Sequence, residues 1–549
     1  MHEAARLVVA TWLALLLGLG QVWAAPPLAA TPAAWTAAAP AERWPSDPGD
    51  GVYYEVFVRS FADASGDGSG DLRGLTARLD HVASLGATGL WLMPIHPSPT
   101  YHGYDVSDYR AINPDYGTMA DFLTFLDAAH ARGLRVVLDL VVNHTSREHP
   151  WFQRALAGDP EYRAYYVWSD ERLDWRGTGS GPAWHPAGDG SYYLGLFEAG
   201  MPDLNHRYPT VTEALLDVAA FWLDLGVDGF RVDAIQHVIE SHDGGIANTS
   251  ENYAWVRDFN AALRARSAGA FLVGETWTAT PAIAAYHRDA GLDMSFNYPL
   301  WRELLAAVQA RSAINLRSQL QLDESAYPAD ARRGTFLANH DQIRPATSLS
   351  PLRRDAARLR LAAGLLLTLP GTPFLYYGEE IGLPNGPSED DRDKRTPMRW
   401  SADASGGFSS ATPWRPPSSS DPDVSVAAQR GDPDALLTWY QRLIALRAAS
   451  PALRDGSLEL VAGLPGSQLA FWRLHADERV LVVANLGAGA VELDVAALGL
   501  DAGAFEDLLA GTAPGDAPGD ADGDADGDAS ADAVALAGTS LRVLRPIAR

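Results

Sequence analysis

Eight short runs of aromatic and β-branched residues alternate with longer stretches of helical periodicity over most of the chain. Two parallel strands need a crossover of about a dozen residues, usually a helix, so this alternation predicts a parallel sheet. Eight such units close a sheet into a (β/α)8 TIM barrel. The predicted strands begin at Tyr53, Thr88, Arg135, Gly229, Phe271, Leu292, Thr335 and Pro373.

One connection in this series is far longer than an ordinary loop. About sixty residues separate the third strand from a helix predicted to begin at Thr210, so we expect a small inserted domain over residues 146–205. Residues 51–145 and 206–450 then form the barrel. The aromatic residues of the insert are interpreted mainly as its core, with stacking on sugar rings as the alternative. They are Trp151, Tyr165, Tyr166, Trp168, Trp184, Tyr192 and Tyr193.

The last hundred residues have a different pattern. Short alternating or apolar runs separated by turn residues predict a C-terminal β-sandwich over residues 451–549. Its expected strands lie in SLELV, QLAFWRLH, RVLVVANL, AVELDV and SLRVLRP. Residues 511–533 are low in complexity and rich in Asp and Gly, and we interpret them as a solvated acidic loop, with calcium binding over 520–528 as the alternative.

The N-terminus has the pattern of an export signal. Arg6 precedes an apolar stretch from Leu7 to Leu19, and Val22 to Ala24 resembles a cleavage site, so residues 1–24 are expected to be a signal peptide. The alternative is an uncleaved membrane anchor, although the stretch is short for a span of about 20 residues. Residues 25–50, rich in Ala and Pro, are expected to be a linker. The protein is therefore expected outside the cell or in a periplasm.

Composition limits the partners. The chain has no cysteine, so an exported protein of this sequence must be stabilised by its core, with or without bound metal, and not by disulfides. A formal net charge of −26 opposes binding to nucleic acid or to anionic lipid. We expect a monomer with a neutral or cationic ligand, no nucleic acid and no membrane contact after signal cleavage.

Polar side chains are concentrated where the predicted strands end. The active site of a (β/α)8 barrel forms at the C-terminal ends of its strands, so these residues should meet at one opening. Each alone is as easily explained as a capping or ion-pair residue, but together they form a convergent set. The set comprises His102, Tyr104, Asn143, His144, Arg231, Asp233, Glu275, Asn339, His340 and Asp341.

Carboxylates around one opening suit glycoside hydrolysis, in which one attacks the anomeric carbon and another protonates the leaving oxygen. Arg231 lies two residues before Asp233 on the same face of the strand and is expected to keep it ionised as a nucleophile. Glu275 follows an apolar strand, where desolvation favours the protonated acid. Asp341 with His340 is expected to stabilise the positive charge that develops on the sugar ring.

The chain resembles the α-amylase family of glycoside hydrolases through four motifs in the family's order. They are DLVVNH (139–144), GFRVDAIQH (229–237), GETW (274–277) and FLANHD (336–341). The resemblance implies Asp233 as nucleophile, Glu275 as acid/base and Asp341 as transition-state stabiliser. It also implies Arg231 as the partner of the nucleophile, and substrate contacts from His102, Tyr104, His144 and His340.

An Asp-rich loop after the first strand is a candidate calcium site. DASGDGSGDLRG, residues 63–74, has the spacing of the first ligands of an EF-hand loop, but its twelfth position is Gly74 where a bidentate glutamate is needed. A solvated turn is the alternative. The α-glucosidase-like part of the resembled family binds structural Ca²⁺ in such a loop, which implies ligands from Asp63, Ser65, Asp67, Ser69 (carbonyl) and Asp71.

Other motifs bear on the type of activity. MPDLN (201–205) resembles a group intermediate between oligo-1,6-glucosidases and neopullulanases, whereas RTPMRW (395–400) resembles α-glucosidases. Ala234 and His237 after the nucleophile resemble α-amylases that act on α-1,4 bonds, with His237 as a further substrate contact. Gln236 departs from the lysine common there and puts the usual contact to the reducing-side sugar in doubt.

These observations predict a secreted, retaining α-amylase that cleaves α-1,4-glucosidic bonds in starch and maltooligosaccharides. An exo-acting α-glucosidase or a maltooligosaccharide transglycosylase is the nearest alternative. An alternative of another class is an inactive, membrane-anchored partner of a transporter. The intact Asp233, Glu275 and Asp341 count against that last interpretation.

Overall fold

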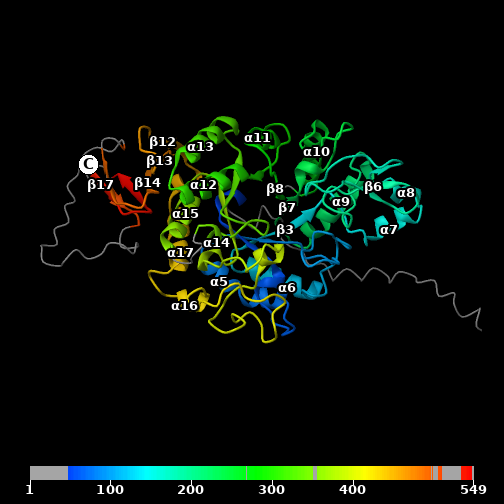
Figure 1. Ribbon diagram of the computed structural model, residues 1–549, viewed down its shortest axis with the longest axis horizontal. Coiled ribbons are helices and arrows are strands. Elements are labelled where there is room, and N and C mark those ends of the chain that lie inside the picture. The colour runs from blue at the N-terminus through cyan, green and yellow to red at the C-terminus, as the bar shows by residue number, and fades with distance from the viewer. Residues whose placement is uncertain are drawn as a thin grey trace, which may run out of the picture. The chain divides into compact units, whose positions relative to one another are not determined.

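The structure is a computed structural model that describes residues 47–267, 269–349, 355–495, 498, 505–509 and 533–546 (Figure 1). The predicted signal peptide, most of the predicted linker and nearly all of the acidic loop lie outside the described residues. No helix within the described ranges is both long and apolar enough to cross a membrane.

Eight parallel strands form a closed barrel, which confirms the predicted fold. Their order around the barrel is β1-β11-β10-β9-β8-β7-β3-β2. They are β1 (Tyr53–Val56), β2 (Gly89–Leu92), β3 (Arg135–Val141), β7 (Gly229–Asp233), β8 (Phe271–Gly274), β9 (Met294–Phe296), β10 (Arg332–Phe336) and β11 (Thr372–Tyr376). Each overlaps a predicted strand, although β10 begins at Arg332, before the predicted Thr335.

Large aromatic side chains fill the inside of the barrel. Tyr53, Trp91, Phe296 and Phe374 belong to one buried cluster, in which the Tyr53 and Phe374 rings stack at 4.9 Å. Gly89 belongs to this packing, because a Cβ at that position would lie 2.4 Å from the ring of Tyr53. A barrel packed in this way is a solid core, so ligands are confined to its ends.

Helices between the strands cover the outside of the barrel. They include α4 (Leu72–Ala77), α5 (Leu79–Ser84), α6 (Met119–His130), α9 (Pro209–Asp224), α10 (Ser250–Arg266), α11 (Thr280–Arg288), α12 (Tyr298–Ala310), α13 (Ile314–Ala326), α15 (Ala356–Thr368) and α17 (Leu436–Ala449). Some of their N-termini carry side-chain caps: Thr118 and Asp121 form a capping box at α6, and the Asn297 side chain caps α12. These caps set the positions at which the strand-to-helix loops end.

The long connection after β3 contains a small folded unit. It holds α7 (Pro150–Leu156), α8 (Pro160–Arg163) and a three-stranded sheet of β4 (Trp168–Ser169), β6 (Tyr192–Leu194) and β5 (Trp184–Pro186). Tyr165, Tyr166, Trp184 and Tyr193 are buried, and Phe152 packs against three of the insert's aromatic rings. The aromatic residues of the insert therefore form its core.

The C-terminal region has a five-stranded and a two-stranded antiparallel sheet, with a shared apolar core between them. The strands are β12 (Ser457–Leu460), β13 (Gln468–His475), β14 (Glu478–Asn485), β15 (Val491–Asp494), β16 (Phe505–Asp507), β17 (Ala533–Leu536) and β18 (Ser540–Pro546). The sequence did not predict β16 or β17. Ala533, assigned to the acidic loop, is the first residue of β17, where it pairs with Asp494.

The predicted linker is also too long at its C-terminal end. Residues Pro48–Asp50 form the short 3-10 helix η1, and Asp47 caps it. Tyr53 donates a hydrogen bond to the Pro48 carbonyl, and Thr372 donates one to the carbonyl of Gly49. This segment is therefore fastened to the N-terminal end of the barrel.

Candidate active site

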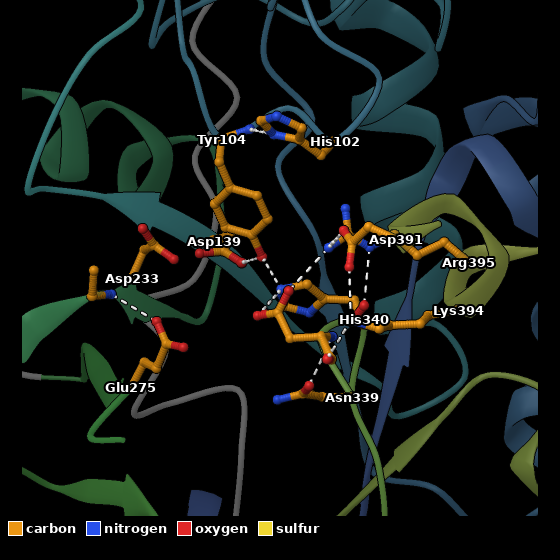
Figure 2. Close-up of polar contacts among 12 residues, drawn as sticks. His102, Tyr104, Asp139, Asp233, Glu275, Asn339, His340, Asp391, Lys394 and Arg395 are labelled. Carbon is orange, nitrogen blue, oxygen red and sulfur yellow. Dashed lines mark hydrogen bonds and ion pairs between the residues drawn. The ribbon is translucent and has the colours of Figure 1, made fainter. Parts of the chain in front are cut away.

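A cleft of about 840 Å³ opens at the C-terminal ends of the barrel strands. It brings together Asp233 at the end of β7, Glu275 directly after β8, and Asp341 in the loop after β10. Further lining residues come from the loops after β2, β3, β7, β8 and β11 and from the insert: His102, Tyr104, His144, Phe197, His237, Trp277, Asp391 and Arg395. Six of the ten predicted residues line this cleft, among them His102, Tyr104, Asp233 and Glu275 (Figure 2), whereas Asn143, Arg231, Asn339 and His340 are buried and do not line it.

Arg231 links three carboxylates beneath the cleft. Its Nη1 lies 2.8 Å from Asp139 Oδ1 and 2.5 Å from Asp233 Oδ1, and its Nη2 lies 2.9 Å from Glu275 Oε2. The guanidinium is 1% exposed. A buried arginine with several carboxylates is held in place by charge-assisted hydrogen bonds that fix both distance and orientation. Asp233 and Glu275 are thereby placed beside each other on adjacent nitrogens of one group.

The backbone after Asp233 also holds Glu275. Ala234 has the left-handed conformation (φ 47°), which is uncommon for a residue with a side chain. Its N–H donates to Glu275 Oε2 at 2.8 Å. Strained backbone of this kind persists only where the surroundings enforce it, and here it turns a donor towards the second carboxylate.

His340 connects β1, the loop after β2 and the third carboxylate. Its Nδ1 lies 2.6 Å from Glu55 Oε1, and its Nε2 lies 3.2 Å from Asp341 Oδ2 and 2.7 Å from the Tyr104 hydroxyl. Tyr104 donates in turn to Asp139 at 2.9 Å. Burial alone would lower the pKa of His340, but Asp341 and Glu55 raise it to about 10. His340 is therefore a cation with both ring nitrogens donating.

A short 3-10 helix, η4 (Asp391–Arg395), approaches the cleft from the loop after β11. Arg395 Nη2 lies 2.9 Å from Asp341 Oδ1 and 2.6 Å from Asp391 Oδ2. Lys394 donates to the Asp341 carbonyl at 2.9 Å and to Asp391 at 2.8 Å (Figure 2). Asp391 is a fourth carboxylate in the cleft, and the two cations of η4 fix it next to Asp341.

The pKa values of the three predicted catalytic carboxylates, Asp233, Glu275 and Asp341, are not all shifted in the same direction. Burial raises the pKa of Asp233 to about 6 against the opposing charge of Arg231, and Asp139 contributes to the rise. Burial also raises the pKa of Glu275. Burial would raise the pKa of Asp341 too, but His340 and Arg395 hold it well below its usual range. Environments that push pKa values apart separate acid from base roles.

The predicted substrate contacts fall into two groups. His102, Tyr104, His144 and His237 line the cleft. Arg231 and His340 are buried at 1% exposure and contact the carboxylates, so substrate contact by these two residues stays a prediction.

His237 already has a protein partner on each ring nitrogen. Its Nδ1 donates to the Ile246 carbonyl at 2.7 Å, and its Nε2 accepts from the Gln236 amide at 3.0 Å. Burial lowers the pKa of His237, which is consistent with this neutral form. Gln236, the departure seen in the sequence, therefore contributes to the conformation of the loop after β7.

The Asp-rich loop after β1 is a compact turn. Asp63 accepts from the N–H groups of Gly66 and Gly68 and from the hydroxyls of Ser65 and Ser409. Asp71 caps α4 by accepting from the N–H of Gly74. In the described part of the chain, no group of three or more His, Cys, Asp or Glu side chains is placed to hold a metal. The side chains of the loop offer oxygen atoms as ligands, which suits a hard cation such as Ca²⁺. Calcium binding by this loop stays a prediction.

Sequence reasoning missed several residues of the site. Glu55 and Asp139 lie within strands that were identified correctly, and alternation along those strands would have placed both inside the barrel. Tyr298 is the second residue after β9, so the strand-end rule would have included it. Asp391 and Arg395 gave no such signal, because they reach the cleft from a 3-10 helix about fifteen residues beyond β11.

Comparison with known proteins agrees with this geometry. The family profile described as the catalytic domain of alpha-amylase matches residues 55–456. Alpha-amylase 3 of Dictyoglomus thermophilum is 38% identical over 441 residues, which cover 79% of this chain and 84% of that protein. Trehalose synthase/amylase TreS of Mycolicibacterium smegmatis is 36% identical over 472 residues, 77% of this chain and 79% of that protein.

A solved structure is similar over the same region. The crystal structure of an alpha-amylase from H. orenii superposes with a TM-score of 0.78 and 34% identity, and it covers 90% of this chain and 99% of its own. The profile match alone spans more than half of the sequence. The chain therefore belongs to the α-amylase family, family 13 of the glycoside hydrolases.

Proposed function

We propose that this protein is a retaining α-amylase that cleaves α-1,4-glucosidic bonds in starch and maltooligosaccharides. One observation carries the proposal: Arg231 holds Asp233 and Glu275 on adjacent nitrogens, with Asp341 in the same cleft. Two carboxyl groups beside each other, one to attack and one to donate a proton, are what double displacement at an anomeric carbon requires.

In this mechanism Asp233, ionised, attacks the anomeric carbon and forms a covalent glycosyl-enzyme. Glu275 gives its proton to the leaving glycosidic oxygen and then removes a proton from the water that completes hydrolysis. Asp341, kept ionised by His340 and Arg395, stabilises the positive charge that develops on the sugar ring. His102, Tyr104 and His144, which also line the cleft, orient that sugar.

The products formed from soluble starch at low conversion test this proposal. Mixed maltooligosaccharides with a rapid loss of iodine colour are expected from an endo-acting α-amylase. Glucose alone with persistent colour would move the assignment to an exo-acting α-glucosidase. An Asp233→Asn preparation measured in parallel identifies any contaminating activity, and no cleavage beyond that control would contradict the proposal.

Transfer to a sugar acceptor is a second candidate activity. The similarity to a protein named trehalose synthase/amylase supports it, because both activities proceed through the same glycosyl-enzyme and differ in whether water or a sugar accepts the glycosyl group. Incubation with maltose distinguishes them. Glucose is the hydrolytic product, whereas a non-reducing disaccharide or longer maltooligosaccharides would indicate transfer.

The raised pKa of Asp233 predicts the acid limb of the pH profile. A nucleophile must be ionised, so kcat/KM for maltotriose should fall about tenfold per pH unit below an apparent pKa of about 6. Because kcat/KM reports the free enzyme, the comparison is with the unliganded site. A profile that stays flat down to pH 4 would show that Asp233 does not have the environment described above.

We further propose that the loop of Asp63, Ser65, Asp67, the Ser69 carbonyl and Asp71 binds one structural Ca²⁺. When bound, the ion would tie the loop between β1 and α4 together and take no part in the chemistry. Dialysed protein should contain about one calcium per chain, and chelation should lower Tm. Asp67→Ala should abolish both effects, whereas Asp127→Ala, at an exposed position on α6, should change neither. Equal calcium in all three preparations would contradict the site.

A further inference from the structure

Tyr298 is a buried residue that faces Glu275 from a neighbouring strand-to-helix junction. It is the first residue of α12, and only Asn297 separates it from the end of β9. The Asn297 side chain accepts from the N–H of Leu300 and donates to Asp323, so the backbone at this junction is firmly held. Tyr298 is 3% exposed, and its ring stacks on Trp277 at 4.8 Å and 6°.

The Tyr298 hydroxyl lies between Asn339 and Glu275. It accepts from Asn339 Nδ2 at 3.3 Å and donates to Glu275 Oε1 at 3.3 Å. The orientation of the Asn339 amide follows from its other contact, since Asn339 Oδ1 accepts from the N–H of Asp341 at 2.9 Å. One chain of hydrogen bonds thus runs from the backbone of Asp341 to the side chain of Glu275. Bonds of this length in a free enzyme often tighten only when substrate is bound.

The two oxygens of Glu275 have different surroundings. Oε2 lies 2.9 Å from Arg231 Nη2 in an ion pair and accepts from the N–H of Ala234. A guanidinium and a backbone N–H can only donate, so neither tolerates a proton on Oε2. The proton of the neutral acid therefore resides on Oε1, the oxygen that faces Tyr298.

Asn339 fixes the direction in which the Tyr298 hydroxyl points. The amide Nδ2 can only donate and occupies a lone pair of the phenol oxygen, so the phenol proton is directed at Glu275 Oε1. An Oε1–H group that also accepts from Tyr298 has to point its own proton away from the tyrosine. Glu275 lines the cleft, so a proton directed away from the buried Tyr298 is available to a group bound there.

We propose that Tyr298 is a positioning residue for the acid step: it keeps the Glu275 proton directed at the glycosidic oxygen and stabilises the carboxylate left after proton transfer. This inference rests on the proposed role of Glu275 as the acid. The proton moves from Oε1 to the leaving oxygen as the bond to the anomeric carbon breaks, and Tyr298 keeps its own proton throughout.

Other charged groups also face Glu275 and do not depend on Tyr298. Arg231 and Asp233 come from β7, His237 from the turn that follows, and Asp341 from the loop after β10. Arg231 favours the ionised acid, whereas Asp233 and Asp341 oppose it. A variant that removes only the Tyr298 hydroxyl leaves all four in place, so its effect can be separated from theirs.

Tyr298→Phe is the direct test. It is measured with two substrates, of which one needs a proton on its leaving group and the other does not. Hydrolysis of maltotriose, which needs the acid, should slow about tenfold in kcat with little change in KM. Hydrolysis of α-maltosyl fluoride, whose fluoride leaves without a proton, should change less than about twofold. The basic limb of the pH profile for maltotriose should move up by about half a unit, because the carboxylate loses a donor.

Tyr440→Phe is the matched control. Tyr440 is also buried and its hydroxyl donates to a glutamate, Glu379, at 2.9 Å, but neither residue lines the cleft. This variant should leave both substrates and the pH profile unchanged. Equal slowing of maltotriose and fluoride by Tyr298→Phe, or a basic limb that does not move, would overturn the inference and indicate a packing role.

Incorporation of 3,5-difluorotyrosine at position 298 adds a second, opposite test. The more acidic phenol is a stronger donor, so the basic limb should move to lower pH, and a shift in the same direction as Tyr298→Phe would overturn the inference. Failure of the proposed function is distinguishable, because wild-type protein would then cleave neither substrate faster than the Asp233→Asn preparation.

Discussion

Replacing Asp233 with Asn should reduce kcat for maltotriose by about 10⁴-fold while the protein remains folded. The amide has nearly the shape of the carboxylate but cannot form the covalent bond to the anomeric carbon. Arg231 keeps two of its three carboxylate partners, Asp139 and Glu275, so the buried network survives. The measurement is steady-state hydrolysis, with circular dichroism to establish the fold.

Thermal unfolding of the same variant checks the electrostatics. The pKa of Asp233 is about 6 in the folded protein and near 3.8 in the unfolded chain. The contribution of Asp233 to the free energy of unfolding is therefore lost as the pH rises from about 4 to 6, and it does not return at higher pH. Asp233→Asn should therefore have a higher Tm than wild type at pH 7.5, and the difference should narrow at pH 4. Asp127→Asn, on the exposed face of α6, should alter neither activity nor Tm. A lower Tm for Asp233→Asn at pH 7.5 would contradict the burial cost assigned to the carboxylate.

Replacing Arg231 with Gln should have the largest effect on stability. Asp139, Asp233 and Glu275 would then be buried near one another without their shared cation. Breaking a buried ion pair from one side costs about 3–5 kcal/mol, because the remaining charge is left uncompensated. Urea unfolding at pH 7.5 should show a loss of this order, and kcat should fall by about 10²-fold or more.

Two further variants separate charge from geometry at this position. Arg231→Lys keeps the positive charge, but the single ammonium group of lysine cannot contact three carboxylates as the planar guanidinium does. This variant should therefore be more stable than Arg231→Gln but less stable than wild type. Arg257→Gln is the control, since Arg257 is paired with Asp258 on the surface at 55% exposure and should contribute little. If Arg231→Gln and Arg257→Gln unfold at the same urea concentration, the network beneath the cleft does not stabilise the fold.

The barrel could be predicted because its strands are rich in apolar residues, which is typical of parallel strands buried on both faces. All eight strands overlap the predicted runs, although β9 begins at Met294 instead of Leu292 and β10 begins at Arg332 instead of Thr335. The strands that escaped prediction are short. β16 has three residues and β17 four, and β17 begins directly after an Asp- and Gly-rich tract that has no strand propensity.

The candidate site was predictable to the extent that strand ends determine it. Asp233, Glu275 and Asp341 were identified from position along the chain, and the cleft brings them together. Asp391 could not be identified in this way. Its place beside Asp341 depends on how η4 packs across the opening, and short-range sequence patterns contain no information about that contact.

The sequence by itself determined the (β/α)8 architecture, the family and the end of the barrel that carries the chemistry. Each of these follows from local periodicity or from motifs within a few residues. Only the tertiary structure decided which groups share a proton or a charge: Arg231 with three carboxylates, His340 with Glu55, and Tyr298 with the outward oxygen of Glu275. The reason is physical, because pKa values and proton positions depend on burial and on distances of a few ångströms between residues far apart in the chain.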